Sequence, residues 1–240
     1  MSVDQNLNAA SIPNRHRAWE IDFLRGLSIL LMVIYHTAYD LKEFYGLPVP
    51  YDHFLVYPLT KLFAGLFIAL CAVSCGFSRR NTRRGLLLLL LAIGITVVTN
   101  IAIPGSNISF GILHLLGVAI LLYPLLHKMG LWPLLIIGLL FIAVSFLLPT
   151  IKVDHDWLAP LGIYSANFSS VDYFPLFPWL GVFMFGIAIG DRFYPVPHSL
   201  LKPLPENIIN RVGRQTLIIY LLHQPLVMGL LYLTLGPPHY

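Results

Sequence analysis

The chain has 240 residues, of which 57% are hydrophobic and only 11% are charged. About a quarter of the residues in an average soluble domain are charged, so this composition excludes an ordinary soluble protein and indicates an integral membrane protein. The formal net charge of +4 does not indicate a nucleic-acid partner, because the basic residues lie in short segments between apolar runs, as topology signals do. We assign no nucleic-acid role.

Several apolar runs approach the roughly 20 residues that a helix needs to cross a bilayer, and no alternating pattern indicates a β-barrel. We therefore predict an all-α fold, a polytopic membrane helix bundle with about seven transmembrane helices. Residues 1–16 are polar and are predicted to form a disordered cytoplasmic tail, while 17–240 form a single transmembrane domain with a retained first span. The predicted spans are residues 19–41, 54–77, 85–103, 109–126, 131–149, 174–190 and 215–235.

The basic residues predict the orientation, because Lys and Arg concentrate in cytoplasmic loops. With the N-terminus inside, the outer side receives only Lys42 and Lys152, and the inner side receives eleven basic residues. These eleven are Arg15, Arg17, Arg79, Arg80, Arg83, Arg84, Lys128, Arg192, Lys202, Arg211 and Arg214. An odd number of spans then places the C-terminus outside. We expect a multi-pass protein of the cytoplasmic (inner) membrane, surrounded by lipid.

The first span carries ionisable side chains where a membrane helix rarely keeps them. Arg25 and His36 lie inside it, and Asp22 and Asp40 lie at its two edges. Each would cost several kcal/mol, by common estimates, if it faced hydrocarbon. At about 100° per residue all four fall on one helix face, with Arg25 and His36 about three turns apart, roughly 16 Å. Either residue alone suits a snorkelling Arg or a buried structural His, but together they favour a functional site.

Two further histidines lie within predicted spans. His114 lies near the outer end of the fourth span, and His223 lies in the seventh, with Tyr220 and Gln224 nearby. For either histidine alone, a hydrogen-bonded buried residue is the alternative to a functional one. No pair has the four-residue helical spacing of strong metal motifs, so no metal site is predicted.

The longest predicted outer segment combines acidic and aromatic side chains. Trp157, Asp172 and Tyr173 belong to this group. Carboxylates suit the hydroxyls of a sugar and aromatic rings suit its C–H faces. The alternative is that these are aromatic residues of the membrane interface and solvated loop charges.

Arg25 and His36, with ten residues between them, match the Arg-to-His motif that opens membrane-bound acyltransferase family 3. The longer string EIDFLRGLSILLMVIYHTAYDL, residues 20–41, resembles more closely the bacterial members of the heparan-alpha-glucosaminide N-acetyltransferase catalytic-domain family, which belong to the same transmembrane acyltransferase superfamily. The similarity covers nearly the whole chain and continues through residues 110–122, 172–190 and 213–226.

The resemblance implies that an acyl group, usually acetyl, is transferred from cytosolic acyl-CoA to a carbohydrate-type acceptor, a glycan or glycolipid, on the far side of the membrane. We hypothesise that His36 is the general base, that Asp40 orients it and that Arg25 guides the CoA arm or its diphosphate. Direct transfer and an acetyl-histidine intermediate both remain open. His114 is a further catalytic candidate. The candidates for acceptor binding are Asp22, Trp157, Asp172, Tyr173, Tyr220, His223 and Gln224.

The inner arginines suit the phosphates of acetyl-CoA, because the guanidinium fork pairs well with phosphate oxygens. Their alternative role is to set the topology. The candidates for CoA binding, besides Arg25, are Arg79, Arg80, Arg83, Arg84, Arg211 and Arg214.

Two features depart from the characterised relatives. Those proteins are longer and have more spans, so this chain is either a minimal core or one protomer of a homodimer. The lysosomal member carries its catalytic histidine in the first luminal loop, which makes His53 an alternative to His36. A different class of function, a transporter or flippase that uses the buried charges as a proton relay, also fits, as does a non-catalytic partner in glycan synthesis.

Overall fold

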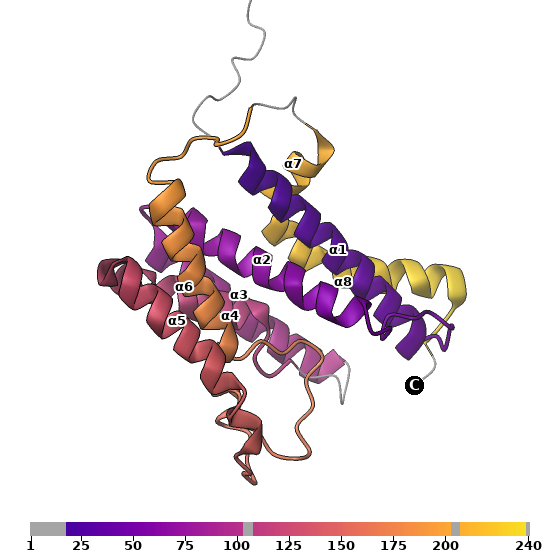
Figure 1. The fold of residues 1–240 in the computed structure, drawn as a ribbon. Helices are drawn as coiled ribbons and strands as arrows, with labels where there is room; N and C mark the ends of the chain where they lie inside the picture. The colour runs from indigo at the N-terminus through magenta and orange to yellow at the C-terminus, as the bar shows by residue number, and fades with distance from the viewer. Residues whose placement is uncertain (1–17, 103–107, 203–206, 239–240) are drawn as a thin grey trace, which may run out of the picture.

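The computed structural model describes residues 18–102, 108–202 and 207–238, and the predicted N-terminal tail lies outside them (Figure 1). The described residues contain helices and no strands, apart from one isolated bridge between Phe110 and Tyr173. The all-α prediction is therefore confirmed. The α-helices are α1 (Trp19–Glu43), α2 (Val56–Gly76), α3 (Asn81–Ala102), α4 (Ile112–Leu126), α5 (Leu131–Ser145), α6 (Leu176–Phe193), α7 (Ile208–Arg214) and α8 (Thr216–Leu235).

Seven helical segments within the described residues are long and apolar enough to cross a membrane, which confirms the predicted number of spans. The protein is therefore an integral, multi-pass membrane protein. Short 3-10 turns at His127–Met129 and Leu148–Thr150 extend α4 and α5. The sequence analysis missed α7, which is too short to cross a membrane and begins where the side chain of Asn207 accepts a hydrogen bond from the Asn210 backbone N–H, at 3.0 Å.

The centre of the bundle is built from α2, α4, α5 and α6. Four side chains, one from each helix, are completely enclosed, because Ile68, Leu115, Leu134 and Phe183 each have an exposed fraction of 0%. α2 lies against α6, α5 lies against α6 on another side, and α3 covers α4. This apolar centre provides a rigid body against which α1 is placed.

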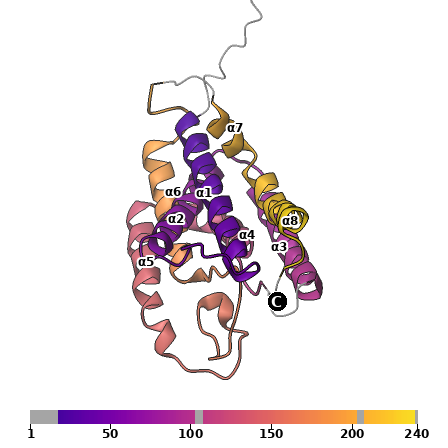
Figure 2. The same cartoon turned by 90° about the vertical axis from the view of Figure 1, so that its right-hand side faces the viewer.

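α1 lies beside α2 and also contacts α7 and α8 (Figures 1 and 2). Its contact with α7 is close, because a Cβ atom at Gly26 would collide with the Ile209 carbonyl and one at Gly213 with the Asp22 carbonyl. α8 is far less enclosed, with only His223 and Leu231 buried along its length. The last helix is therefore attached to the bundle by a few specific contacts.

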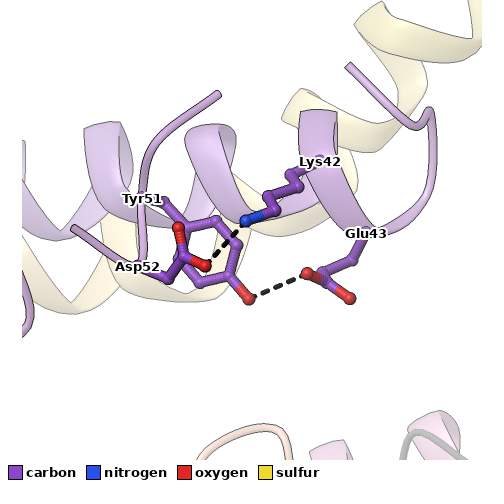
Figure 3. Close-up of polar contacts among 4 residues, drawn as sticks. All are labelled: Lys42, Glu43, Tyr51 and Asp52. Carbon is purple, nitrogen blue, oxygen red and sulfur yellow. Dashed lines mark hydrogen bonds and ion pairs between the residues drawn. The ribbon is translucent and has the colours of Figure 1, made fainter. Parts of the chain in front are cut away.

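The segment between α1 and α2 folds back over the end of α1 (Figure 3). Lys42 donates a hydrogen bond to Asp52 at 2.8 Å, and the Tyr51 hydroxyl donates one to Glu43, also at 2.8 Å. The hydrogen bond from Lys42 lowers the pKa of the Asp52 carboxyl. These two contacts hold Tyr51 in place beside α1, where its side chain lines a cavity.

Candidate functional site

A cavity of about 420 Å³ lies between α1, α2, α8 and the segment that precedes α6. Most of its walls are apolar, which is usual for small-molecule sites. The polar side chains in its wall include His36 from α1, Lys61 from α2, Tyr220 from α8 and Asp172 and Tyr173 from the segment before α6. The structure thus brings four of the predicted site residues together and adds Lys61.

His36 is held by a second histidine. Its Nδ1 lies 2.9 Å from Nε2 of His223, and Nδ1 of His223 lies 2.7 Å from the Tyr220 carbonyl oxygen. A carbonyl oxygen can only accept, so Nδ1 of His223 carries the proton and its Nε2 is the acceptor in the neutral ring. His36 must then donate through Nδ1–H, which leaves the lone pair on His36 Nε2.

This assignment matters because His36 lines the cavity. Its Nε2 has no hydrogen-bond partner among the residues that the structure describes. The ring is therefore in the tautomer that a general base needs, with the basic nitrogen available to a bound molecule. The two rings are nearly coplanar, with an interplanar angle of 23° and centroids 5.1 Å apart, so the hydrogen bond joins them edge to edge and restricts the plane of the His36 ring.

Asp40 was predicted to orient His36, but its carboxylate is hydrogen-bonded to Gln224 instead. The side-chain amide of Gln224 donates to both of its carboxylate oxygens, at 2.9 Å each, and Asp40 is only 1% exposed. Within the described residues no hydrogen bond joins Asp40 to His36. The side chain hydrogen-bonded to His36 is therefore His223 and not Asp40, and the pair formed by Asp40 and Gln224 joins α8 to α1.

Asp172 joins three elements at the cavity wall. Its Oδ2 accepts hydrogen bonds from the Ile112 backbone N–H and the Tyr220 hydroxyl, at 3.0 Å each. Burial raises the pKa of the Asp172 carboxyl, while these two hydrogen bonds and the charge of Lys61 act to lower it. The carboxylate lies at the N-terminus of α4, where the helix dipole favours a negative charge. Gly111 is required here, because a Cβ atom would collide with the Asp172 carboxylate.

Lys61 was not predicted as a site residue. Its ammonium group lies 5.3 Å from the Tyr57 ring centroid and 5.0 Å from that of Phe174. The sequence carried a signal for it, because Lys61 is a charged residue inside an apolar span, and such residues usually face a cavity or a partner.

Arg25 points to a different neighbour from His36. Its charge acts on Cys71 of α2, as does that of Arg84, and its Nε is buried without a hydrogen-bond partner among the described residues. Arg25 does not line the cavity, whereas Ile29, one turn further along α1, does. The structure therefore places Arg25 outside the cavity lining, with its charge acting on Cys71 of α2.

Four of the predicted CoA-binding arginines surround one depression of about 530 Å³ at the junction of α2 and α3. The four are Arg79, Arg80, Arg83 and Arg84. Arg84 also donates a hydrogen bond to Asn81 at 3.2 Å. The other two, Arg211 and Arg214, are on α7, which packs against the first turns of α1.

The remaining predicted residues lie outside the cavity, with one exception. His53 is exposed and accepts a hydrogen bond from the Leu55 backbone N–H at 3.4 Å. His114 accepts one from the Gly111 N–H at 3.2 Å. Tyr173 does line the cavity, and its hydroxyl donates to a backbone carbonyl. Asp22 is buried in the contact between α1 and α7.

Trp157 is 79% exposed and lies beside the ring of His155. It is therefore a surface residue of the segment between α5 and α6. No group of three or more His, Cys, Asp or Glu side chains within the described ranges is arranged to hold a metal ion.

Comparison with curated proteins gave no match, and neither did comparison with solved structures. The sequence model of one family, described as heparan-alpha-glucosaminide N-acetyltransferase, catalytic, matches residues 17–225. This range includes the whole of α1 to α7 and the part of α8 that carries Tyr220, His223 and Gln224. The match extends over most of the chain, and the protein therefore belongs to the heparan-alpha-glucosaminide N-acetyltransferase catalytic-domain family.

Proposed function

We propose that the protein transfers an acetyl group from cytosolic acetyl-CoA to a carbohydrate-type acceptor at the cavity lined by His36. The family supports acetyl transfer. The single observation that carries the assignment of the site is the contact between His36 and His223, which leaves His36 Nε2 unprotonated beside a cavity of about 420 Å³.

In this mechanism the amine or hydroxyl of the acceptor attacks the thioester carbonyl while its proton passes to His36 Nε2. The carbon–sulfur bond then breaks, and the CoA thiolate leaves and takes the proton back from His36. His223 accepts the Nδ1–H of His36 throughout and stabilises the imidazolium formed between the two steps, as the orienting group of a catalytic triad does. An acetyl-imidazole intermediate would use the same nitrogen.

The inner side of the protein suits the nucleotide end of the co-substrate. The depression surrounded by Arg79, Arg80, Arg83 and Arg84 offers several guanidinium groups to the phosphates. The charge of Arg25 acts on the same cysteine as that of Arg84, and we infer that the route from the depression to the cavity passes these two side chains. The thin pantetheine arm would follow this route past Ile29 to reach His36.

The test compares His36→Ala with His53→Ala in purified protein, with acetyl-CoA as donor and an amino-sugar glycoside that has a free amine as acceptor. Loss of a general base typically costs 10²–10⁴-fold in rate, and we expect that loss for His36→Ala with acetyl-CoA binding retained. We expect His53→Ala to keep its activity, because that ring lies outside the cavity. Full activity in His36→Ala and loss in His53→Ala would move the base to the loop.

The same proteins in sealed proteoliposomes separate acetyl transfer from transport. Acetylated acceptor that appears without net movement of lipid or solute supports the enzyme. Solute or lipid movement that depends on a proton gradient, without acetylated product, would instead show that His36 and His223 form a proton relay.

A further inference from the structure

The ammonium group of Lys61 is the one charge at the cavity wall without a hydrogen bond to any described residue. Its contacts are the ring faces of Tyr57 and Phe174 and the electrostatic attraction of Asp172. Aromatic faces attract a cation, but they leave its three N–H donors unused. An ammonium group in this position can therefore donate hydrogen bonds to acceptor atoms of a bound molecule.

Asp172 does not by itself supply the hydrogen-bond acceptor that the Lys61 ammonium group lacks. Its Oδ2 is already bonded to the Ile112 N–H and the Tyr220 hydroxyl, and no direct ion pair joins it to Lys61 among the described residues. Buried charges are normally paired or hydrogen-bonded, because an unpaired one is costly. The strongest partner for an ammonium group under these conditions is an anion such as a phosphate.

The cavity also reaches the surface of the bundle that faces lipid. Ile34 of α1 and Leu59 of α2 both line it, yet they are 63% and 47% exposed. Ile34 lies well inside α1 and Leu59 in the first turn of α2, and exposed aliphatic side chains of membrane-spanning helices face acyl chains. The cavity is therefore open to the bilayer between α1 and α2, and its walls are mostly apolar.

We propose that the acceptor is a lipid-linked molecule that carries a phosphate, which enters from the bilayer between α1 and α2 and places its phosphate on Lys61. This proposal rests on the proposed acetyl transfer and names the class of acceptor. Lys61 and His36 line the same cavity, so a phosphate held by Lys61 brings the group attached to it next to His36 Nε2. The apolar tail leaves through the opening beside Ile34 and Leu59.

The first experiment measures acetyl transfer to two matched acceptors, glucosamine joined to a farnesyl chain through a phosphate and the same sugar and chain without the phosphate. Charge-assisted hydrogen bonds predict that the wild type prefers the phosphate acceptor by roughly 10- to 100-fold in kcat/KM. We expect Lys61→Gln to lose this preference, chiefly through a higher KM for the phosphate acceptor. Lys61→Arg keeps the charge and should retain most of the preference.

The control is Lys152→Gln, which removes an exposed lysine that does not line the cavity. It should leave the preference unchanged, and an equal loss in this variant would show that a general surface charge is responsible. If the wild type acetylates both acceptors equally well, the proposal fails while the proposed enzyme activity stands.

The second experiment needs no turnover and therefore separates the two proposals. Native mass spectrometry measures how much farnesyl phosphate and how much farnesol remain bound to the purified protein. We expect the wild type and His36→Ala to retain the phosphate preferentially, and Lys61→Gln to retain both equally. Equal binding of farnesyl phosphate by the wild type and Lys61→Gln would overturn the proposal whatever the activity of the enzyme.

Discussion

His223 determines the state of His36 through a chain of two hydrogen bonds that ends on a backbone carbonyl. The carbonyl of Tyr220 fixes the proton of His223 on Nδ1, and Nε2 of His223 fixes the proton of His36 on its Nδ1. The base that we propose is thus hydrogen-bonded to a neutral ring and not to a carboxylate. The nearest acidic residue on the same helix, Asp40, is bonded to Gln224.

This arrangement predicts that His223→Ala lowers kcat by roughly 10²-fold or more, because the tautomer and ring orientation of His36 are no longer fixed. We expect KM for acetyl-CoA to change little, because the side chains proposed to bind acetyl-CoA are arginines and do not include His223. Steady-state kinetics measure kcat and KM, and the ¹⁵N chemical shifts of isotope-labelled histidines measure the tautomer of His36.

The wild type should show a single His36 tautomer protonated at Nδ1, and His223→Ala should show a mixture. A purely structural role for His223 would lower the amount of folded protein without changing the His36 tautomer in the remainder. An unchanged tautomer with normal kcat would remove His223 from the mechanism.

At the level of whole helices, α8 is held to α1 by the pair formed by Asp40 and Gln224. The carboxylate is 1% exposed and receives both of its described hydrogen bonds from one amide nitrogen. Removing a partner from a buried charged group is more damaging than removing both groups, because the remaining one keeps its desolvation cost.

We therefore expect Gln224→Leu to lower the free energy of unfolding by about 1–3 kcal/mol. The measurement is the Tm of the protein in detergent, taken from the amount that remains in the size-exclusion peak after heating. The double variant Asp40→Leu with Gln224→Leu should recover most of the loss, with a coupling of about 0.5–3 kcal/mol. Thr234→Ala, at the exposed end of α8, is the matched control and should have a small effect. Additive losses in the double variant would show that the pair does not couple the helices.

The surroundings of the α1 side chains could be predicted only in part from the sequence. Arg25 and His36 fall on one stripe of α1, yet Arg25 faces α2 near Cys71, while His36 faces α8. The helix period places residues on a face, but the angle at which neighbouring helices cross decides which neighbour each turn meets.

For the molecule as a whole, the spans were predictable because each depends on the apolar content of about 20 consecutive residues. The contacts that make the site were not, because His36 and His223 are 187 residues apart and Asp172 and Tyr220 are 48 apart. A single lysine in a span is consistent with snorkelling, so the position of Lys61 in the cavity needed the structure. The short α7 carries too few residues for a periodic signal.

The orientation of the molecule yields a separate prediction. With the basic loops inside, a membrane-impermeant maleimide applied to right-side-out vesicles should label Lys152→Cys and leave Lys128→Cys unlabelled until the vesicles are opened. Both positions are exposed, and the two natural cysteines are buried, which keeps the background low. The reverse labelling pattern would show the opposite orientation in the membrane, with the end of the cavity that Tyr51 lines on the cytosolic side.

The three polar links of α8, through Tyr220, His223 and Gln224, all lie within little more than one turn of that helix. Any displacement of α8 large enough to separate it from α1 therefore disconnects the partner of His36 in the same movement. Under the proposed function, the His36 imidazole of that widened form would have no fixed tautomer, and water that entered would meet no general base beside the thioester. The proposed function thus predicts that the contact between α8 and α1 which activates His36 also limits hydrolysis of the donor.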